Sequence, residues 1–143
     1  MYNINRSALV AYSDQKMFDL INDVENYQEF LPWCGGSKII EETNSTRTGA
    51  VTIAFKGVHK TFTTKNTLIP YKEIGMQMVD GPFSKLEGTW SFKKLDDDAC
   101  KISLDLEFDF SNRLVGAVIG PVFKIIANSM LDSFIKRAED LYS

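Results

Sequence analysis

Histidine and cysteine, which build most metal sites and many catalytic centres, are scarce in this sequence. The 143 residues include one His and two Cys. Cys34 and Cys100 are too few for a disulfide scaffold, and their spacing fits no structural zinc motif. A Ser-His-Asp arrangement would depend on His59 alone, and no histidine cluster, phosphate-binding loop or dinucleotide fingerprint is present. We therefore expect no metal site and no enzyme with its own catalytic machinery.

Long apolar runs and leader-like features are missing as well. The longest apolar stretch, residues 114–127, is interrupted by Lys124 and contains Pro121, whereas a membrane-spanning helix needs about 20 predominantly apolar residues. The first residues, MYNINRSALVAY, have neither the basic region nor the long apolar region of a signal peptide. With 44% apolar and 24% charged residues, the sequence is typical of a soluble cytoplasmic domain with reduced thiols.

Acidic residues are absent from residues 51–72, although the net charge of the chain is −3. The negative net charge argues against binding DNA. The acid-free segment is a candidate contact with an anionic surface, and a solvated strand face that carries lysines is the simpler alternative. Its cationic and histidine residues are Lys56, His59, Lys60, Lys65 and Lys72.

Hydrophobic periodicity gives the order of the elements. Residues 2–12 are predicted as a strand, Ser13 offers the N-cap of a first short helix, and a second short helix over residues 25–31 ends before Pro32. From residue 37 to residue 110 the period changes to two, which predicts about six strands with one face in the core and one in water.

Residues 112–142 are predicted as a long amphipathic helix. Gly120-Pro121 should interrupt its first third, because a proline ring clashes with the preceding turn and removes a hydrogen bond. The short piece before the break would then gate an interior site, since opening elements come from the less stable parts of a structure. A curved antiparallel sheet wrapped around the helix would bury both apolar faces.

Several local sequences, in order along nearly the whole chain, resemble one family closely. They are RSALVAYS, NDVENYQEFLPWC, FKGVHKTFTTKN, VDGPFSKLEGTWSF, FDFSNRL, GPVFK and RAEDLYS. The family holds the coenzyme Q-binding proteins and the bacterial ribosome association toxin RatA, and it is often labelled polyketide cyclase or lipid transport. The resemblance implies an α+β fold of the START-like, helix-grip type. About seven antiparallel strands would curve around a long C-terminal helix, with two short helices after the first strand and one ligand-binding domain over residues 1–143.

The resemblance also implies an apolar tunnel between the sheet and the terminal helix. Ubiquinone or a similar prenyl lipid is the leading ligand, in support of respiratory electron transport, and no cofactor is required. Asn66 and Arg6 are polar candidates for fixing the quinone carbonyls; the alternative is that both emerge at the tunnel mouth or pair with backbone groups. For every apolar candidate the alternative is simple core packing. The predicted ligand contacts are Trp33, Phe55, Phe62, Asn66, Met76, Met78, Phe83, Trp90, Leu104, Leu106, Phe108, Val115, Ile119, Val122 and Phe123.

Three functions stay open at this point. The first is a non-catalytic binder of a quinone or other apolar molecule, with peripheral contact to the inner membrane as a further expectation. The second is a translation-inhibiting toxin that blocks ribosomal subunit association, with the acid-free segment as its contact on the large subunit. The third is a cyclase-type enzyme, which needs a buried ionisable group that the sequence does not place.

Overall fold

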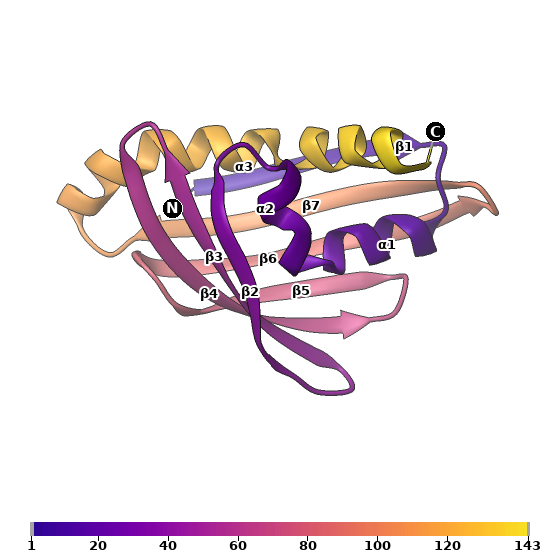
Figure 1. Ribbon diagram of the computed structural model, residues 1–143, viewed down its shortest axis with the longest axis horizontal. Coiled ribbons are helices and arrows are strands. Elements are labelled where there is room, and N and C mark those ends of the chain that lie inside the picture. The colour runs from indigo at the N-terminus through magenta and orange to yellow at the C-terminus, as the bar shows by residue number, and fades with distance from the viewer. Residues whose placement is uncertain (1, 143) are drawn as a thin grey trace.

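Seven antiparallel strands and one long helix make up the fold, which the computed structural model describes over residues 2–142 (Figure 1). The strands are β1 (Tyr2–Val10), β2 (Cys34–Glu42), β3 (Thr46–Phe55), β4 (Val58–Ile69), β5 (Glu73–Asp80), β6 (Phe83–Asp96) and β7 (Ala99–Phe110). The helices are α1 (Asp14–Asn22), a 3-10 turn η1 (Val24–Asn26), α2 (Tyr27–Phe30) and α3 (Arg113–Tyr142).

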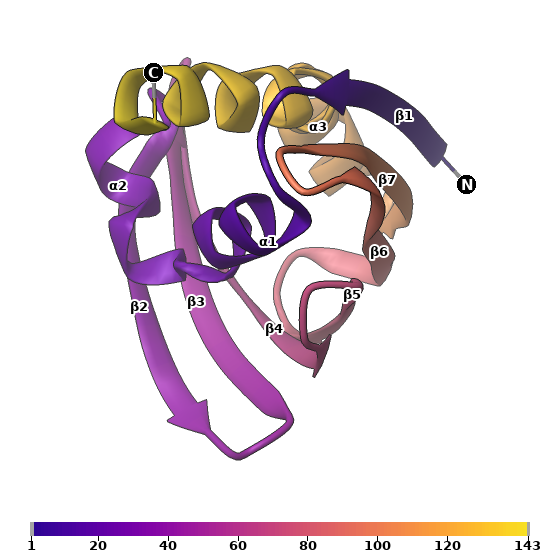
Figure 2. The ribbon, with the colours of Figure 1, turned by 90° about the vertical axis from the view of Figure 1, so that its right-hand side faces the viewer.

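The strands form a single sheet in the order β1-β7-β6-β5-β4-β3-β2. Consecutive strands from β2 to β7 are neighbours, while β1 pairs with β7 at the far edge, so α1, η1 and α2 connect the two edges of the sheet. Figure 2 shows the sheet curving into a cup, with α3 across its open side and α1 near one end. The predicted START-like arrangement is thereby confirmed.

Strand β7 shows why the sheet has one apolar face. Cys100, Ile102 and Leu104 are at most 1% exposed, whereas the intervening Lys101 and Asp105 face solvent. Such alternation buries one face of an antiparallel strand and hydrates the other. Cross-strand pairs extend the same face, as where Trp90 of β6 lies opposite Leu104.

The short helices after β1 seal one end of the cup. Ser13 caps α1, its Oγ accepting from the backbone N–H of Lys16 at 3.1 Å. Phe18 of α1 then packs edge-on against Phe92 of β6, with ring centroids 5.6 Å apart. The second predicted helix is present in a different form, because residues 24–26 wind as a 3-10 turn and α2 follows as a single turn.

The predicted interruption at Gly120-Pro121 is wrong, because α3 runs unbroken for 30 residues with Pro121 inside it. The φ angle of proline suits a helix, but the ring removes the backbone hydrogen bond to the carbonyl of Ala117 and crowds that carbonyl. Pro121 and Ala117 are both exposed, so water can hydrate that carbonyl. Gly120 lies buried against Phe110, where its Cβ position would be 3.4 Å from the ring.

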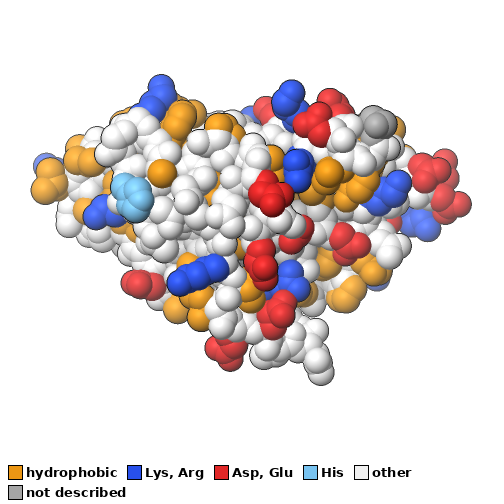
Figure 3. Space-filling model, viewed as in Figure 1, with side chains coloured by type: hydrophobic (Ala, Val, Ile, Leu, Met, Phe, Trp, Pro, Cys, Tyr) orange, Lys and Arg blue, Asp and Glu red, His pale blue; other side chains and the backbone are white. Residues whose placement is uncertain are grey.

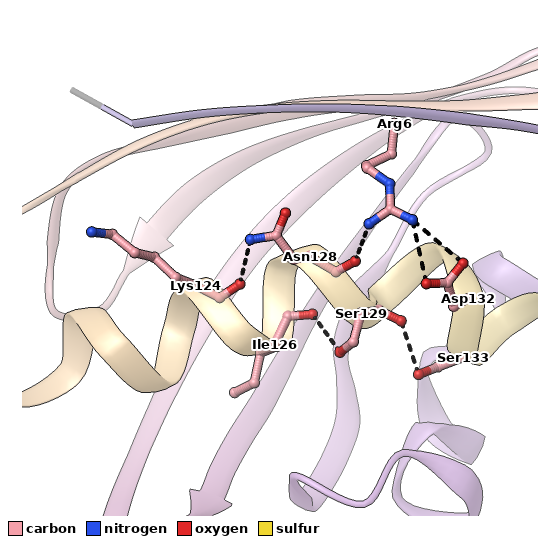
Figure 4. Close-up of polar contacts among 7 residues, drawn as sticks. All are labelled: Arg6, Lys124, Ile126, Asn128, Ser129, Asp132 and Ser133. Carbon is pink, nitrogen blue, oxygen red and sulfur yellow. Dashed lines mark hydrogen bonds and ion pairs between the residues drawn. The ribbon is translucent and has the colours of Figure 1, made fainter.

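Arg6 ties β1 to the middle of α3, as Figure 4 shows. Its Nη1 donates to the carbonyl of Asn128 at 2.6 Å, and its Nη2 lies 3.3 Å from the Asp132 carboxylate. The hydroxyls of Ser129 and Ser133 donate instead to carbonyls within the helix. The second half of α3 is therefore fixed to the edge of the sheet by a charged side chain.

Gly88 of β6 lies where a side chain would clash. A Cβ there would be 2.8 Å from the Asp105 carbonyl oxygen, 2.8 Å from Leu106 Cδ1 and 3.0 Å from Met76 Cε. We expect Gly88→Ala to lower the free energy of unfolding by about 1–3 kcal/mol, because overpacking displaces these neighbours. Gly75→Ala on β5 is the control, since its Cβ would meet nothing closer than 3.9 Å. Urea unfolding measures both variants, and equal midpoints would contradict the expectation.

Candidate ligand cavity

A small cavity of about 70 Å³ lies between the concave face of the sheet and α3. Its wall is mostly apolar. The predicted ligand contacts that line it are Trp33, Phe62, Asn66, Met76, Trp90, Leu104, Leu106 and Phe123. The lining residues that sequence reasoning missed are Val24, Tyr27, Gly49, Val51, Thr64, Leu86 and Met130.

Some of the missed residues carried a usable signal. Thr64 shares strand parity with Phe62 and Asn66, both of which are predicted to point inward. Val51 and Leu86 likewise share parity with residues assigned to the core. By contrast, Tyr27 comes from the irregular segment after α1, where no period applies. Strand alternation alone therefore identifies residues of the cavity wall that the predicted contacts omit.

The other predicted contacts lie in the hydrophobic core or pack against it, outside the cavity lining. Phe83 and Phe108 pack around Phe123, with ring centroids 4.7 Å and 4.8 Å from it. The remaining residues of this group are Phe55, Met78, Val115, Ile119 and Val122, all of which belong to or pack against the hydrophobic core. Arg6 also lies outside the lining, engaged with α3.

Two of the residues that line the cavity carry side-chain N–H donors, and that of Trp33 has no acceptor. Trp33 is 3% exposed and its buried Nε1 has no hydrogen-bond partner. Asn66 is 7% exposed, and Thr64 Oγ1 donates to its Oδ1 at 3.1 Å. The amide N–H groups of Asn66 add further donors among the lining residues. An unsatisfied buried donor costs about 1–3 kcal/mol, so a ligand oxygen that accepted a hydrogen bond from Trp33 would remove this cost.

Tyr27 adds a polar atom to the wall but no acid or base. Its hydroxyl donates to the carbonyl of Ile21, and burial, followed by the charge of Asp23, raises its pKa far above the ordinary value. The phenol therefore stays neutral and already bonded near neutral pH. It is suited to shaping the cavity rather than to transferring a proton.

The cavity is smaller than a typical binding site for a small molecule. Sites for small molecules usually measure about 300–1,000 Å³, and the 70 Å³ found here corresponds to roughly two water molecules. A quinone ring would have to displace side chains such as Phe123 and Met130, which α3 contributes to the wall. A ligand of that size therefore needs these side chains, or the helix that carries them, to move.

The predicted ribosome-contact residues are exposed but do not form one cluster. Lys56, His59 and Lys60 lie at the β3–β4 hairpin end, whereas Lys72 follows the other end of β4. Lys65 borders a groove on the outer face of the sheet, and the other charged residues of that groove are Glu87, Asp105 and Glu107. The hairpin end is therefore the part of this segment best suited to an anionic partner.

Cys34 and His59 do not form a catalytic dyad. Cys34 of β2 lies opposite Ile53 of β3, and His59 of β4 lies opposite Ala54, so the two backbones are separated by two strand spacings, roughly 10 Å. Cys34 Sγ donates to the Gly36 carbonyl. Burial raises the pKa of the thiol, which disfavours the nucleophilic thiolate.

Comparison with known proteins agrees with this geometry. Residues 10–135 match the family described as polyketide cyclase / dehydrase and lipid transport. The chain belongs to this family. Ribosome association toxin RatA of Pseudomonas aeruginosa is 47% identical over 140 residues, which cover 98% of this chain and 97% of that protein. The mitochondrial coenzyme Q-binding protein COQ10 homolog B of Xenopus laevis is 25% identical over 142 residues, which cover 96% of this chain and 58% of that protein.

Solved structures of low sequence identity share the fold. The Zhui aromatase/cyclase from Streptomyces sp. R1128 superposes with a TM-score of 0.84 at 17% identity, covering 96% of this chain and 93% of that chain. A START superfamily protein from Mycobacterium smegmatis gives 0.83 at 19% identity, covering 99% of both chains. At this level of sequence identity the similarity establishes the fold alone. The chemistry has to be inferred from the residues of this chain.

The thiols offer a direct test of nucleophilic chemistry. In a Cys100→Ala variant, the rate at which iodoacetamide alkylates Cys34 should keep rising with pH beyond about 8.5, the ordinary thiol pKa, because burial keeps the thiol protonated. In a Cys34→Ala variant, Cys100 should react only on unfolding, since it is fully buried with its pKa raised to about 11. A Cys34 rate that levelled off near neutral pH would instead reveal a stabilised thiolate and favour an enzyme.

Proposed function

We propose that this chain is a non-catalytic binder of an apolar ligand that carries a hydrogen-bond acceptor, with ubiquinone or a similar prenyl quinone as the leading candidate. The observation that carries the proposal is the unpaired, buried N–H of Trp33, together with the amide of Asn66, among residues that line an apolar cavity under α3. A quinone carbonyl would satisfy either donor, and its ring and tail would suit the aromatic and aliphatic wall. No cofactor is required for this role.

The comparisons support the proposal in a general way. The family description includes lipid transport, and the Xenopus laevis relative is named as a coenzyme Q-binding protein. A location in the cytoplasm, peripheral to the membrane that supplies the quinone, follows from the same proposal. Burial of a prenyl tail would contribute about 25 cal/mol per Å² of apolar area, offsetting the displacement of Phe123 and Met130 from the wall.

The proposal is tested first by mass spectrometry of an organic extract of the purified protein, and then by titration with a short-tailed ubiquinone analogue. Trp33→Phe keeps an aromatic ring but removes the N–H donor, and Asn66→Leu removes the amide donor. We expect each variant to weaken quinone binding by about 5- to 15-fold, the loss that one hydrogen bond of 1–1.5 kcal/mol entails.

Ile102→Val is the matched control, because it is a small change at a fully buried position that does not line the cavity. It should lower stability slightly and leave the quinone affinity unchanged. If wild-type protein yields no lipid and does not bind the analogue, or if Trp33→Phe and Asn66→Leu bind as tightly as the control, the proposal is wrong.

A second function, association with the ribosome, is favoured by the relatives. The 47% identity to a protein named ribosome association toxin RatA extends over nearly the whole chain. We infer that this chain also acts on the large ribosomal subunit, with the β3–β4 hairpin end as its contact. Lys56, His59 and Lys60 lie exposed there, and a local cationic surface is needed because the net charge of −3 opposes binding to RNA.

Charge reversal at the hairpin should show whether the hairpin end or the rest of the acid-free segment contacts the ribosome. The double variant Lys56→Glu/Lys60→Glu should weaken binding to large subunits and flatten the log–log dependence on salt, by about 0.7–0.9 for each phosphate that the protein no longer neutralises. Lys65→Glu/Lys72→Glu should have a smaller effect, since these lysines lie away from the hairpin end. Sedimentation with purified subunits measures both, and equal weakening by the two variants would contradict the hairpin assignment.

A further inference from the structure

The first half of α3 is apolar on two faces. Its inward face carries Ile119, Val122 and Phe123, all buried in the core. Its outward face carries an outer stripe, defined here as Leu114, Ala117, Val118, Pro121 and Ile125, all exposed. These positions recur at the spacing of one helix face, and Leu114, Val118 and Ile125 are 74%, 59% and 47% exposed. A helix that is apolar all round is expected inside a core or against lipid.

The outer stripe differs from other exposed apolar residues of the chain. Leu9, Ile40 and Leu95 are also exposed, but each lies on a different strand, and single apolar side chains on a surface need no explanation. The stripe extends for about 17 Å along one helix, at 1.5 Å per residue. It ends where the same face becomes polar, at Asn128 and Asp132. The apolar character is therefore confined to the first half of α3.

The charged residues of the first half of α3 are all of one sign. Residues 110–131 contain no Asp or Glu, and Arg113 and Lys124 are their charged residues. The Nζ of Lys124 lies 4.2 Å from the ring centroid of Tyr2, which is itself 38% exposed. In Figure 3, the upper left-hand end of the molecule, where α3 begins and the β3–β4 hairpin turns, shows hydrophobic, basic and histidine side chains, while acidic ones gather elsewhere.

We propose that the outer stripe of α3 docks on the surface of a bilayer that contains anionic lipids. An apolar helix face flanked by Lys or Arg is the arrangement that inserts shallowly among headgroups, and anionic lipids attract cationic segments near the surface. A second copy of the chain fits less well. The stripe offers on the order of a few hundred Å², below the ~800 Å² per partner of a stable interface, and two copies would bring their Arg113 and Lys124 side chains together.

Docking through the outer stripe would also bring the first half of α3, which covers part of the cavity, to the bilayer. The first half of α3 contributes Phe123 to the cavity wall, so an apolar ligand could pass from lipid to cavity without crossing water. This route, unlike the docking itself, depends on the proposed ligand-binding function.

The test is co-sedimentation of the full chain with vesicles of phosphatidylcholine alone and with vesicles of equal parts phosphatidylcholine and phosphatidylglycerol. Wild type should bind the mixed vesicles more tightly, and salt should weaken that binding. Leu114→Asp/Val118→Asp should weaken binding at least about tenfold, because two apolar side chains are replaced by anions. Lys124→Glu should weaken binding about fivefold or more, through the reversed headgroup attraction.

Matched controls lie elsewhere on the surface. Leu9→Asp changes a side chain of similar exposure on β1, and Lys136→Glu reverses an exposed lysine in the second half of α3; both should bind vesicles like wild type. Absence of vesicle binding by wild type, or equal weakening in the controls and the stripe variants, would overturn the docking proposal. So would a stable dimer, seen by light scattering, that Leu114→Asp/Val118→Asp converts to a monomer.

The short-tailed quinone analogue separates this proposal from the ligand-binding one. The stripe variants should bind the analogue in solution as wild type does, because none of their changed residues lines the cavity. Vesicle binding without quinone binding would support docking and contradict the ligand proposal. Quinone binding without vesicle binding would do the reverse.

Discussion

The closure of the apolar sheet face by α3 is the constraint on which the structure depends. A curved sheet with one apolar face is stable when another element covers that face, and α3 is the long element across the open side of the cup. Phe123 is central to this contact, since its ring lies within 5 Å of both Phe83 and Phe108. Removing such a ring from water contributes about 1.5–3 kcal/mol. The helix that would have to admit a ligand therefore also completes the core.

This double role explains the small cavity. With α3 in place the side chains leave 70 Å³, so a larger ligand has to displace side chains of the wall, including those that α3 contributes. The second half of α3 is held by polar contacts: Arg6 binds the Asn128 carbonyl and Asp132, and Arg137 lies 3.6 Å from Glu29. The first half rests mainly on aromatic contacts and includes Pro121, which lacks a backbone N–H. Movement is therefore expected to start in the first half, where fewer directional bonds must break.

Much of the fold could be predicted from the sequence because strand alternation is a local property. The pattern of β7 alone identifies its buried face, and the same parity placed Asn66 inward, where it lies. The boundary of the cavity is a different kind of property. Phe108 and Trp90 are equally suited to a cavity wall by pattern, yet Trp90 borders the void and Phe108 does not. Which of them does so depends on how side chains from distant elements interdigitate.

The acid-free segment shows the same difference between order in the sequence and position in space. Residues 51–72 are a continuous acid-free stretch in sequence, but β4 extends 12 residues, or about 40 Å at 3.3 Å per residue. Lys60 and Lys72 are consequently too far apart to meet one small anionic site. The cross-strand neighbours of a charge, which the sequence does not give, decide its surroundings, and Lys65 is thereby placed beside a groove that also contains Glu87.

Polarity, rather than the Gly120-Pro121 pair, divides α3 into two parts. Beyond residue 127 the outward face carries Asn128, Asp132 and Lys136, as expected of a helix that only covers a sheet, whereas the outer stripe before it remains apolar. The β3–β4 hairpin turns beside this first half (Figure 1), and Phe62 of β4 contacts Phe123 there. A bilayer on the outer stripe and an RNA surface at Lys56 and Lys60 would thus occupy the same end of the molecule. If both proposals hold, the two partners compete, because a bilayer that covered the outer stripe would leave too little room for a ribosomal subunit at the hairpin.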